Sequence, residues 1–192
     1  MNTATHTFVT PAEYLAREEA AETRTEYADG VLLPMPGGTP QHSRVKVRIV
    51  YLLEAALENG DFIVYNSDIR VGVPSAHRYY YPDAVVVAGT PQLDERWQPV
   101  ILLNPLLVVE VLSPSTAEHD QGRKFAGYQT IPTLCEYLRI DSEQVRVVQW
   151  VRVAAGHWQA TTYQQLSDTV PLQGLPALLP VQQVYRRVQL EA

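Results

Sequence analysis

The chain has 192 residues, of which 46% are hydrophobic and 19% are charged, a composition typical of a globular protein with enough material for a core. Its net charge of -6 argues against constitutive binding of nucleic acid over a broad basic surface, but allows an enzyme that contacts phosphates over a small patch. The single cysteine, Cys135, excludes an internal disulfide and a multi-cysteine metal site and fits a reducing cytoplasm. No apolar run is long enough to cross a bilayer and the N-terminus lacks the pattern of a secretory signal, so we expect a cytoplasmic protein with no membrane partner.

The first half of the chain predicts two helices separated by a hairpin. A Thr-Pro pair opens a helix over residues 10–22, with Glu13 three residues after the threonine cap. Residues 23–35 are typical of a hairpin that turns at Ala28-Asp29-Gly30. A second Thr-Pro pair opens an amphipathic helix over residues 39–60, which ends at a glycine.

Strands dominate the rest of the chain. Residues 61–73 predict one or two strands, residues 79–89 another, and residues 105–113 the most strongly buried strand. A short helix over residues 120–130 should stop at Ile131-Pro132, because the residue before proline avoids helical conformation. Two strands over residues 135–153 and a third over 157–164 complete a mixed α/β fold, which we expect to be a single domain over residues 1–192.

Two of these strands each carry one carboxylate among apolar neighbours: Asp83 in "YPDAVVV" and Glu110 in "LLVVEVL". An ionised carboxylate without a partner costs several kcal/mol to bury, so such a group is paired, protonated or bound to a metal. Two carboxylates on adjacent strands suit Mg²⁺, which takes oxygen ligands and keeps several waters. Side chains alternate along a strand, which leaves the backbone carbonyl of Val111 as a further candidate ligand.

A lysine follows on the next predicted helix. Asp120, Lys124 and Tyr128 are spaced four residues apart and share one face of this helix. If that face packs over the sheet, Lys124 reaches Glu110 and could stabilise the charge that develops on a phosphate. Two structural alternatives remain open: the acids are capped by an arginine or an amide, and Asp120 and Lys124 form a surface pair worth about 0.3–0.5 kcal/mol.

The combined pattern resembles the Uma-two family of restriction endonucleases, within the PD-(D/E)xK nuclease superfamily. The segments that carry the resemblance are spread from about residue 10 to about residue 185. They are "TEYADG", "MPGGTPQHSRV", "YYYPDAVVV", "LVVEVLSPST", "DQGRKFAGYQ" and "IPTLCEYLRID". The resemblance implies a restriction-endonuclease-like core, a mixed sheet flanked by helices, with a site that depends on Mg²⁺ or Mn²⁺.

The resemblance also implies roles for individual residues. Asp83 matches the aspartate of the PD motif and Glu110 the acidic residue of the second motif. Leu112 stands where the superfamily has its lysine, so the lysine is displaced onto the following helix as Lys124. Family members often carry a glutamate directly after the Asp-Gly turn, where this chain has Val31, which leaves Glu26 as the candidate third carboxylate.

Other residues are candidates for the rim of the site or for contacts with DNA phosphates. His42 matches a family position, although a histidine in the first turn of a helix is commonly a surface residue. Arg44, Lys46 and Arg48 form a basic stretch in which the two arginines share a face, although a solvated face is the default reading. Asp120, Arg123 and Tyr128 complete this candidate set.

The leading hypothesis is therefore a Mg²⁺-dependent DNA endonuclease with Asp83, Glu110 and Lys124 as catalytic residues and DNA as partner. The alternative is a binding module that has kept the fold without cleavage, which the acidic pI, the missing E-x-K and Val31 favour. A glycoside hydrolase with a carboxylate pair ranks lower, because the lysine has no role in that scheme. The apolar tail around residues 178–184 could form a homodimer interface or complete the core.

Overall fold

The computed structural model describes residues 8–35, 37–112 and 121–190. Its helices are α1 (Pro11–Glu19), α2 (Pro40–Leu57), the 3₁₀ turn η1 (Pro74–Ala76), α4 (Gln121–Tyr128) and α5 (Val181–Val184). Its strands are β1 (Thr25–Ala28), β2 (Val31–Pro34), β3 (Phe62–Asn66), β4 (Arg70–Val73), β5 (Arg78–Tyr80), β6 (Ala84–Ala88), β7 (Leu93–Asp94), β8 (Ile101–Leu102), β9 (Leu107–Leu112), β10 (Glu136–Asp141), β11 (Val147–Ala154), β12 (His157–Tyr163), β13 (Thr169–Pro171) and β14 (Leu178–Pro180).

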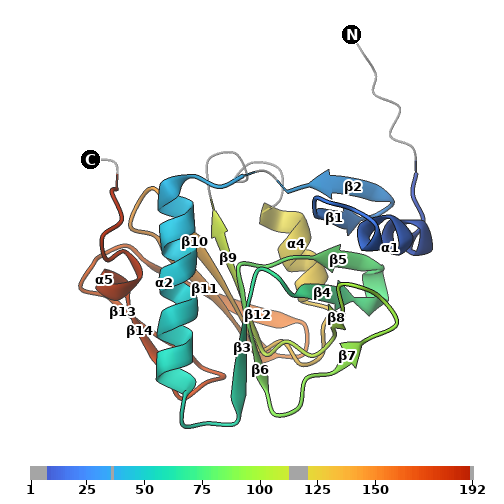
Figure 1. Ribbon diagram of the computed structural model, residues 1–192. Helices are drawn as coiled ribbons and strands as arrows, with labels where there is room; N and C mark the ends of the chain where they lie inside the picture. Colours follow the sequence, from blue (N-terminus) through green and yellow to red (C-terminus); the bar gives the residue numbers. More distant parts are fainter. Residues whose placement is uncertain (1–7, 36, 113–120, 191–192) are drawn as a thin grey trace.

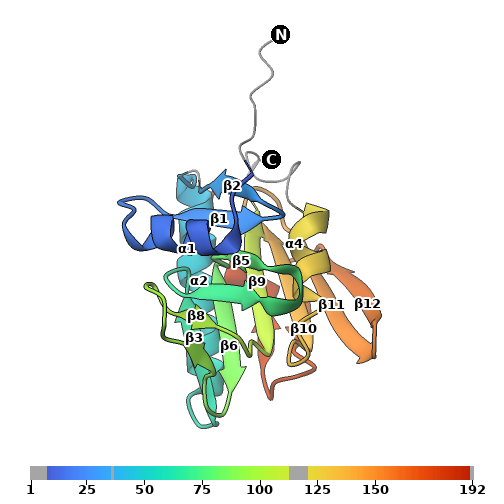
Figure 2. The ribbon, with the colours of Figure 1, turned by 90° about the vertical axis from the view of Figure 1, so that its right-hand side faces the viewer.

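A six-stranded mixed sheet in the order β12-β11-β10-β9-β6-β3 forms the centre of the molecule. Strands β9 and β10 are parallel and the other neighbours are antiparallel. Helix α2 lies along one face of this sheet and α4 covers part of the other face, as two perpendicular views show (Figures 1 and 2). The predicted mixed sheet flanked by helices is confirmed.

The strand that carries Glu110 is buried on both faces, so its side chains divide between two cores. Val109 and Val111 belong to the cluster that α2 fills with Val45 and Ile49. Val108 belongs to the cluster on the opposite face, which includes Tyr128 of α4. Because side chains alternate along a strand, Glu110 points with Val108 toward α4 rather than toward α2.

A second six-stranded sheet, in the order β2-β1-β5-β4-β8-β7, lies beside the central one (Figure 1). Helix α1 packs against it through Tyr14 and Leu15. The expectation of one strand over residues 79–89 is wrong: β5 ends at Tyr80 in this second sheet, and β6 begins at Ala84 in the central sheet. Pro82 lies between them, and because proline has no N–H to donate to a ladder, the strand breaks there.

The predicted starts of α1 and α2 are confirmed and some ends differ. Thr10 and Glu13 form the reciprocal capping box, and the Thr39 side chain accepts from the His42 N–H. Helix α1 ends at Glu19, three residues before the predicted end. No helix in the described part of the chain is long and apolar enough to cross a membrane.

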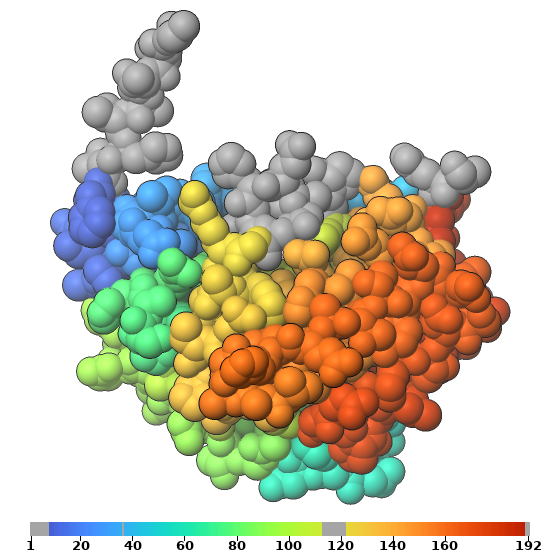
Figure 3. All heavy atoms as spheres, turned by 180° about the vertical axis from the view of Figure 1, so that it is seen from behind, coloured from blue at the N-terminus to red at the C-terminus, as the bar shows by residue number. Residues whose placement is uncertain are grey.

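The apolar tail completes the core. Strands β13 and β14 form a hairpin, and Leu179, Val181 and Val184 are buried in the same cluster as α2. Arg48 connects α2 to this tail, because its Nε–H donates to the carbonyl of Gln183 at 2.9 Å. Seen from behind, the C-terminal strands in orange and red cover much of the surface beside α4 in yellow (Figure 3).

Candidate active site

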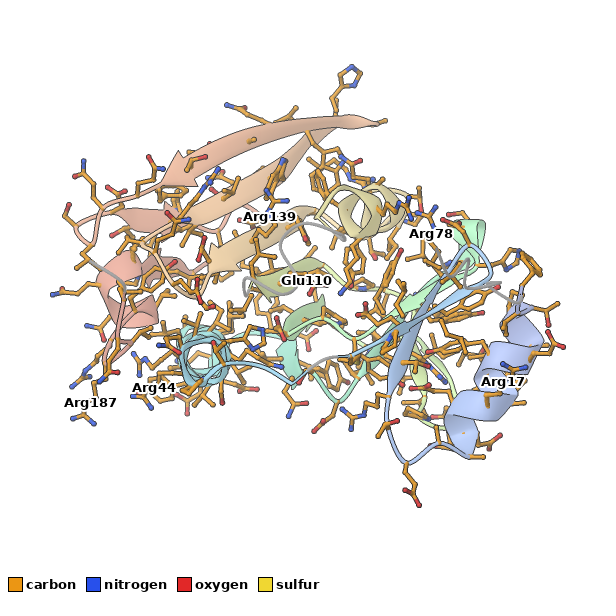
Figure 4. All side chains as sticks on the ribbon, turned by 90° about the horizontal axis from the view of Figure 1, so that it is seen from above. Arg17, Arg44, Arg78, Glu110, Arg139 and Arg187 are labelled. Carbon is orange, nitrogen blue, oxygen red and sulfur yellow. The ribbon has the colours of Figure 1, made fainter. Side chains whose placement is uncertain are left out.

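A cavity of about 430 Å³ opens where α2, the end of β9 and the β1–β2 hairpin meet. Most of the sequence-predicted site residues lie in its wall, and Glu110 lies between the α2 and α4 sides of the molecule when viewed from above (Figure 4). The ionisable and hydroxyl side chains of the wall are Glu26, His42, Ser43, Lys46, Tyr81, Asp83, Glu110, Lys124 and Tyr137.

Asp83 sits directly before β6 and is held by the backbone of β9. Its N–H donates to the carbonyl of Val109 at 3.0 Å, and its Oδ2 accepts from the N–H of Val111 at 2.7 Å. Its Oδ1 pairs with the Nζ of Lys46 at 2.8 Å. Burial alone would raise the pKa of Asp83, but His42, Lys46 and the Val111 N–H together hold that pKa below its usual range. Asp83 is therefore a fixed, ionised carboxylate.

Glu110 is a buried carboxyl in the adjacent strand. The hydroxyl of Tyr128 donates to Oε1 at 3.1 Å, and the Nζ of Lys124 lies 3.5 Å from the same oxygen. Burial raises the pKa of Glu110 to about 8; Lys124 acts against this shift, while the negative charges of Asp83 and Glu26 add to it. The raised pKa means that ionising Glu110 is unfavourable in this site unless a cation compensates its charge.

Lys124 is held by a third carboxylate. Its Nζ lies 2.8 Å from Oε1 of Glu26, and that oxygen also accepts from the backbone N–H of Tyr81 at 3.0 Å. Glu26 is in β1 of the second sheet and Lys124 is in α4, so this ion pair joins the second sheet to the helix that covers part of the central sheet. The geometry brings Lys124 to Glu110, as the helix spacing predicted.

Helix α2 contributes His42 and Lys46, with Ser43 and Val47, to the opposite side of the cavity wall. The Nε2–H of His42 donates to the carbonyl of Val111 at 3.0 Å, and Nε2 lies 3.7 Å from Oδ2 of Asp83, beyond hydrogen-bond distance. Lys46, one helical turn later, pairs with Asp83. His42 is thus a wall residue whose side chain is only 14% exposed, not a surface residue.

The remaining candidates lie around the site rather than in it. Tyr128 donates a hydrogen bond to Glu110 from α4, and Arg123 is exposed on the same helix. Arg44 projects outward on the far side of α2 (Figure 4), and Arg48 is bonded to Gln183 of α5. Asp120 lies outside the described residues.

Lys46 and the backbone of Tyr81 were not assigned to the site from the sequence. Lys46 was noted only as part of a basic stretch. Its spacing of four residues from His42 places both on one helical face, and that spacing is the signal that could have identified it. Nothing local marks the Tyr81 N–H, because its role depends on the pairing of β1 with β5, two strands far apart in the sequence.

The donor set fits a hard cation. Asp83 and Glu110 offer carboxylate oxygens, and the carbonyl of Val111, which already accepts from His42, has a second lone pair. Among the described residues, no group of three or more His, Cys, Asp or Glu side chains is arranged as a complete metal site. Mg²⁺ does not require one, because one or two carboxylates with several waters suffice.

Comparisons with known proteins agree with this architecture. The family Uma2, described as "Putative restriction endonuclease", matches residues 11–182. Two uncharacterised proteins of Synechocystis sp. are similar: one is 36% identical over 84% of this chain and 90% of its own length, the other 35% identical over 93% and 92%. A solved structure from Anabaena variabilis, described as "a putative nuclease belonging to DUF820", superposes with a TM-score of 0.73 at 16% identity, and the superposition covers 94% of this chain and 99% of that one. At that identity the structural likeness establishes the fold.

Proposed function

The chain belongs to the Uma2 family, and from this premise we propose that it is a divalent-metal-dependent endodeoxyribonuclease. The observation that carries the proposal is the meeting of Asp83, Glu110 and Lys124 on one cavity, with Lys124 3.5 Å from Glu110. Asp83, Glu110 and the Val111 carbonyl would hold Mg²⁺ or Mn²⁺. When bound, the ion would act as a Lewis acid on the phosphate and lower the pKa of a coordinated water.

The residues of the chain have separable tasks in this reaction. Asp83 is kept ionised and in place by the Val111 N–H, so it offers a fixed anionic oxygen. Glu26 holds the ammonium of Lys124 at 2.8 Å, where it can orient the attacking water or donate to a phosphate oxygen. Water attacks phosphorus in line, the bond from phosphorus to the 3′ oxygen breaks, and that oxygen takes up a proton. The products carry a 5′-phosphate and a 3′-hydroxyl.

A cleavage assay with matched isosteric variants tests this function. Supercoiled, linear duplex and single-stranded DNA are incubated with Mg²⁺, with Mn²⁺ and with EDTA. The wild type should cut at least one substrate only with metal. Asp83→Asn and Glu110→Gln should lose the activity, and Lys124→Gln should lower it by about 10²–10³-fold, the usual effect of removing one group that stabilises transition-state charge.

Glu54→Gln provides the matched control, because Glu54 is exposed on α2 at a position outside the cavity wall. It should cut at the wild-type rate. Cleavage that persists at the wild-type rate in Glu110→Gln would show a contaminating nuclease or a different site. Cleavage that is unaffected by EDTA would remove the metal from the proposal.

A second candidate is a binding module that does not cleave. The observation in its favour is that Lys46 and Lys124 already pair with Asp83 and Glu26, so part of the negative charge of the site is neutralised without a metal. This candidate predicts that no nucleic acid is cut, although folded protein still binds DNA.

A further inference from the structure

Lysine is rare in this chain and is concentrated at the cavity. Of 15 basic Lys and Arg residues, only Lys46 and Lys124 are lysines. Both ammonium groups lie 2.8 Å from a carboxylate oxygen of the cavity wall. Lysine carries a compact charge on a flexible stem, whereas the planar arginine head suits fixed two-point pairing. The two lysines are therefore the movable cations of the site.

The two lysines differ in their carboxylate partners and in the exposure of their side chains. Lys124 lies between Glu26 and Glu110, and its side chain is 14% exposed. Lys46 approaches Asp83 from α2, and its side chain is 26% exposed on the cavity side. The other Asp83 oxygen, Oδ2, accepts from the Val111 N–H and keeps a second lone pair. Because both oxygens belong to one carboxylate, a cation bound at Asp83 would lie within a few ångströms of the Lys46 ammonium, whichever oxygen it used.

We propose that Lys46 is a displaceable counter-ion that leaves Asp83 when a divalent cation binds and then contacts a phosphate of the nucleic acid. The proposal rests on the proposed function for the nature of the substrate. An ammonium and a divalent cation compete for one carboxylate, and their mutual repulsion at a few ångströms favours separation. The flexible stem and partial exposure of Lys46 let the ammonium move into the open cavity, whereas Lys124 stays with Glu26.

A purely structural role makes the opposite prediction. If Lys46 only neutralises a buried aspartate, its removal lowers the stability of the fold and does not tighten metal binding. The sign of the change in metal affinity therefore separates the two roles.

The first experiment is calorimetric titration of Mg²⁺ into the wild type, Lys46→Gln, Lys46→Arg and Arg17→Gln. Arg17→Gln makes the same charge change on α1, away from Glu110 (Figure 4). Lys46→Gln should bind Mg²⁺ at least about tenfold more tightly than the wild type, because no cation has to be displaced. Lys46→Arg should bind Mg²⁺ no more tightly than the wild type, since it keeps the positive charge and suits fixed pairing with Asp83. Arg17→Gln should stay within about threefold, since it removes a charge at a screened distance. Equal or weaker binding by a folded Lys46→Gln overturns the proposal.

A second readout follows the ammonium group itself. Reductive ¹³C-methylation labels two side-chain amines, Lys46 and Lys124, besides the N-terminus. On addition of Mg²⁺ the Lys46 signal should shift and narrow as the side chain becomes mobile, and Asp83→Asn should abolish the metal response. A Lys46 signal that keeps its position and width in saturating Mg²⁺ overturns the displacement.

The phosphate contact is measured with Ca²⁺ in place of Mg²⁺, by fluorescence anisotropy of a labelled DNA duplex over a range of salt concentrations. Lys46→Gln should bind the duplex severalfold more weakly, and the slope of log affinity against log salt should fall by about one phosphate contact. An unchanged slope overturns this half of the proposal.

These outcomes are distinguishable from failure of the nuclease function. If the wild type cleaves DNA but Lys46→Gln shows no gain in Mg²⁺ affinity, the counter-ion role fails and the nuclease stands. If no substrate is cut but the metal affinities follow the expected order, the nuclease fails and the displacement stands. If neither the wild type nor Lys46→Gln binds Mg²⁺, the counter-ion role is overturned, and the cleavage assay decides separately on the nuclease.

Discussion

The hydroxyl of Tyr128 donates a 3.1 Å hydrogen bond to Oε1 of Glu110, and both side chains are buried. Tyr128 makes no direct contribution to the cavity wall, so it acts by fixing the orientation of the carboxyl. Groups that orient a metal ligand in this way are commonly worth 10–100-fold in metal affinity or activity. Glu110 thus depends on α4 twice, through Tyr128 and through Lys124.

Tyr128→Phe should weaken Mg²⁺ binding by about tenfold and lower the free energy of unfolding by about 1 kcal/mol, the net value of one buried hydrogen bond. Calorimetry and urea denaturation measure the two effects. Tyr51→Phe is the control, because Tyr51 is 59% exposed, and should change stability by less than about 0.5 kcal/mol. A loss of stability with unchanged metal affinity would limit Tyr128 to packing.

Arg44 and Arg48 share a face of the predicted helix, but their substitution should have different effects on stability and on DNA binding. Arg48 is bonded to Gln183 and lies over the Tyr51 ring, whereas Arg44 projects outward (Figure 4). Arg48→Ala should therefore lower the free energy of unfolding by about 1–2 kcal/mol and leave the salt dependence of DNA binding unchanged. Arg44→Ala should leave stability within about 0.5 kcal/mol and, if Arg44 contacts a phosphate, reduce the salt slope by about one.

Urea denaturation measures the stability of the two variants, and anisotropy titrations at several salt concentrations measure their DNA binding. Equal effects of the two variants on DNA binding would contradict the structural role of Arg48, which is to connect α2 to α5.

Local patterns were sufficient for much of the fold, for three residues of the candidate site and for Tyr128 beside it. The Thr-Pro caps and apolar periodicity located α1 and α2, and carboxylates among apolar neighbours marked Asp83 and Glu110. The four-residue spacing along α4 placed Lys124 and Tyr128 on one face, which the structure turns toward Glu110. Each of these signals lies within one element, where period and capping chemistry are readable.

The other features depend on how distant segments meet. The Lys46–Asp83 pair requires the rotation of α2 over the sheet, and the bond from Tyr81 to Glu26 requires the pairing of β1 with β5. Neither follows from periodicity. Pro82 is a local signal for the break between β5 and β6, since a proline rarely lies inside a central strand. The apolar run after Asp83 nevertheless favoured one continuous strand in the prediction.

Glu136 provides a pH prediction away from the site. It is buried in β10, where its carboxylate accepts from the amide of Gln149 and from the N–H of Gln173. Burial raises the pKa of Glu136 in spite of these hydrogen bonds. A raised pKa in the folded state means that its contribution to stability is complete below the unfolded pKa of about 4.5 and is lost as pH rises through the folded pKa.

Glu136→Gln removes this titration, so its stability relative to the wild type should improve as pH rises from about 4 to about 7. Urea denaturation at several pH values measures the difference. Glu13→Gln should show the opposite trend, because the capping box lowers the pKa of Glu13 and its contribution is lost as pH falls. If the free energies of unfolding of Glu136→Gln and the wild type change in parallel with pH, the raised pKa of Glu136 is contradicted.

Arg70 is a buried cation that the fold should not need for stability. Its side chain is fully buried beneath the rings of Tyr14 and Tyr79, at 5.7 and 6.0 Å from their centroids. It donates from Nη2 to the carbonyl of Pro99, while Nε and Nη1 have no hydrogen-bond partner among the described residues. Removing an ion from water costs several kcal/mol, and two cation–π contacts offset only about 1–2 kcal/mol each.

Arg70→Met should therefore be as stable as the wild type to within about 1 kcal/mol, or more stable, because a flexible apolar chain fills the same space. Arg70→Ala should lose about 3 kcal/mol, since it leaves a cavity under the tyrosine rings. The free energies of unfolding of the two variants, measured in urea with EDTA present, separate the charge from the volume. An equal loss of several kcal/mol in both would show that the guanidinium itself, through the Pro99 carbonyl and the rings, holds this part of the second sheet together.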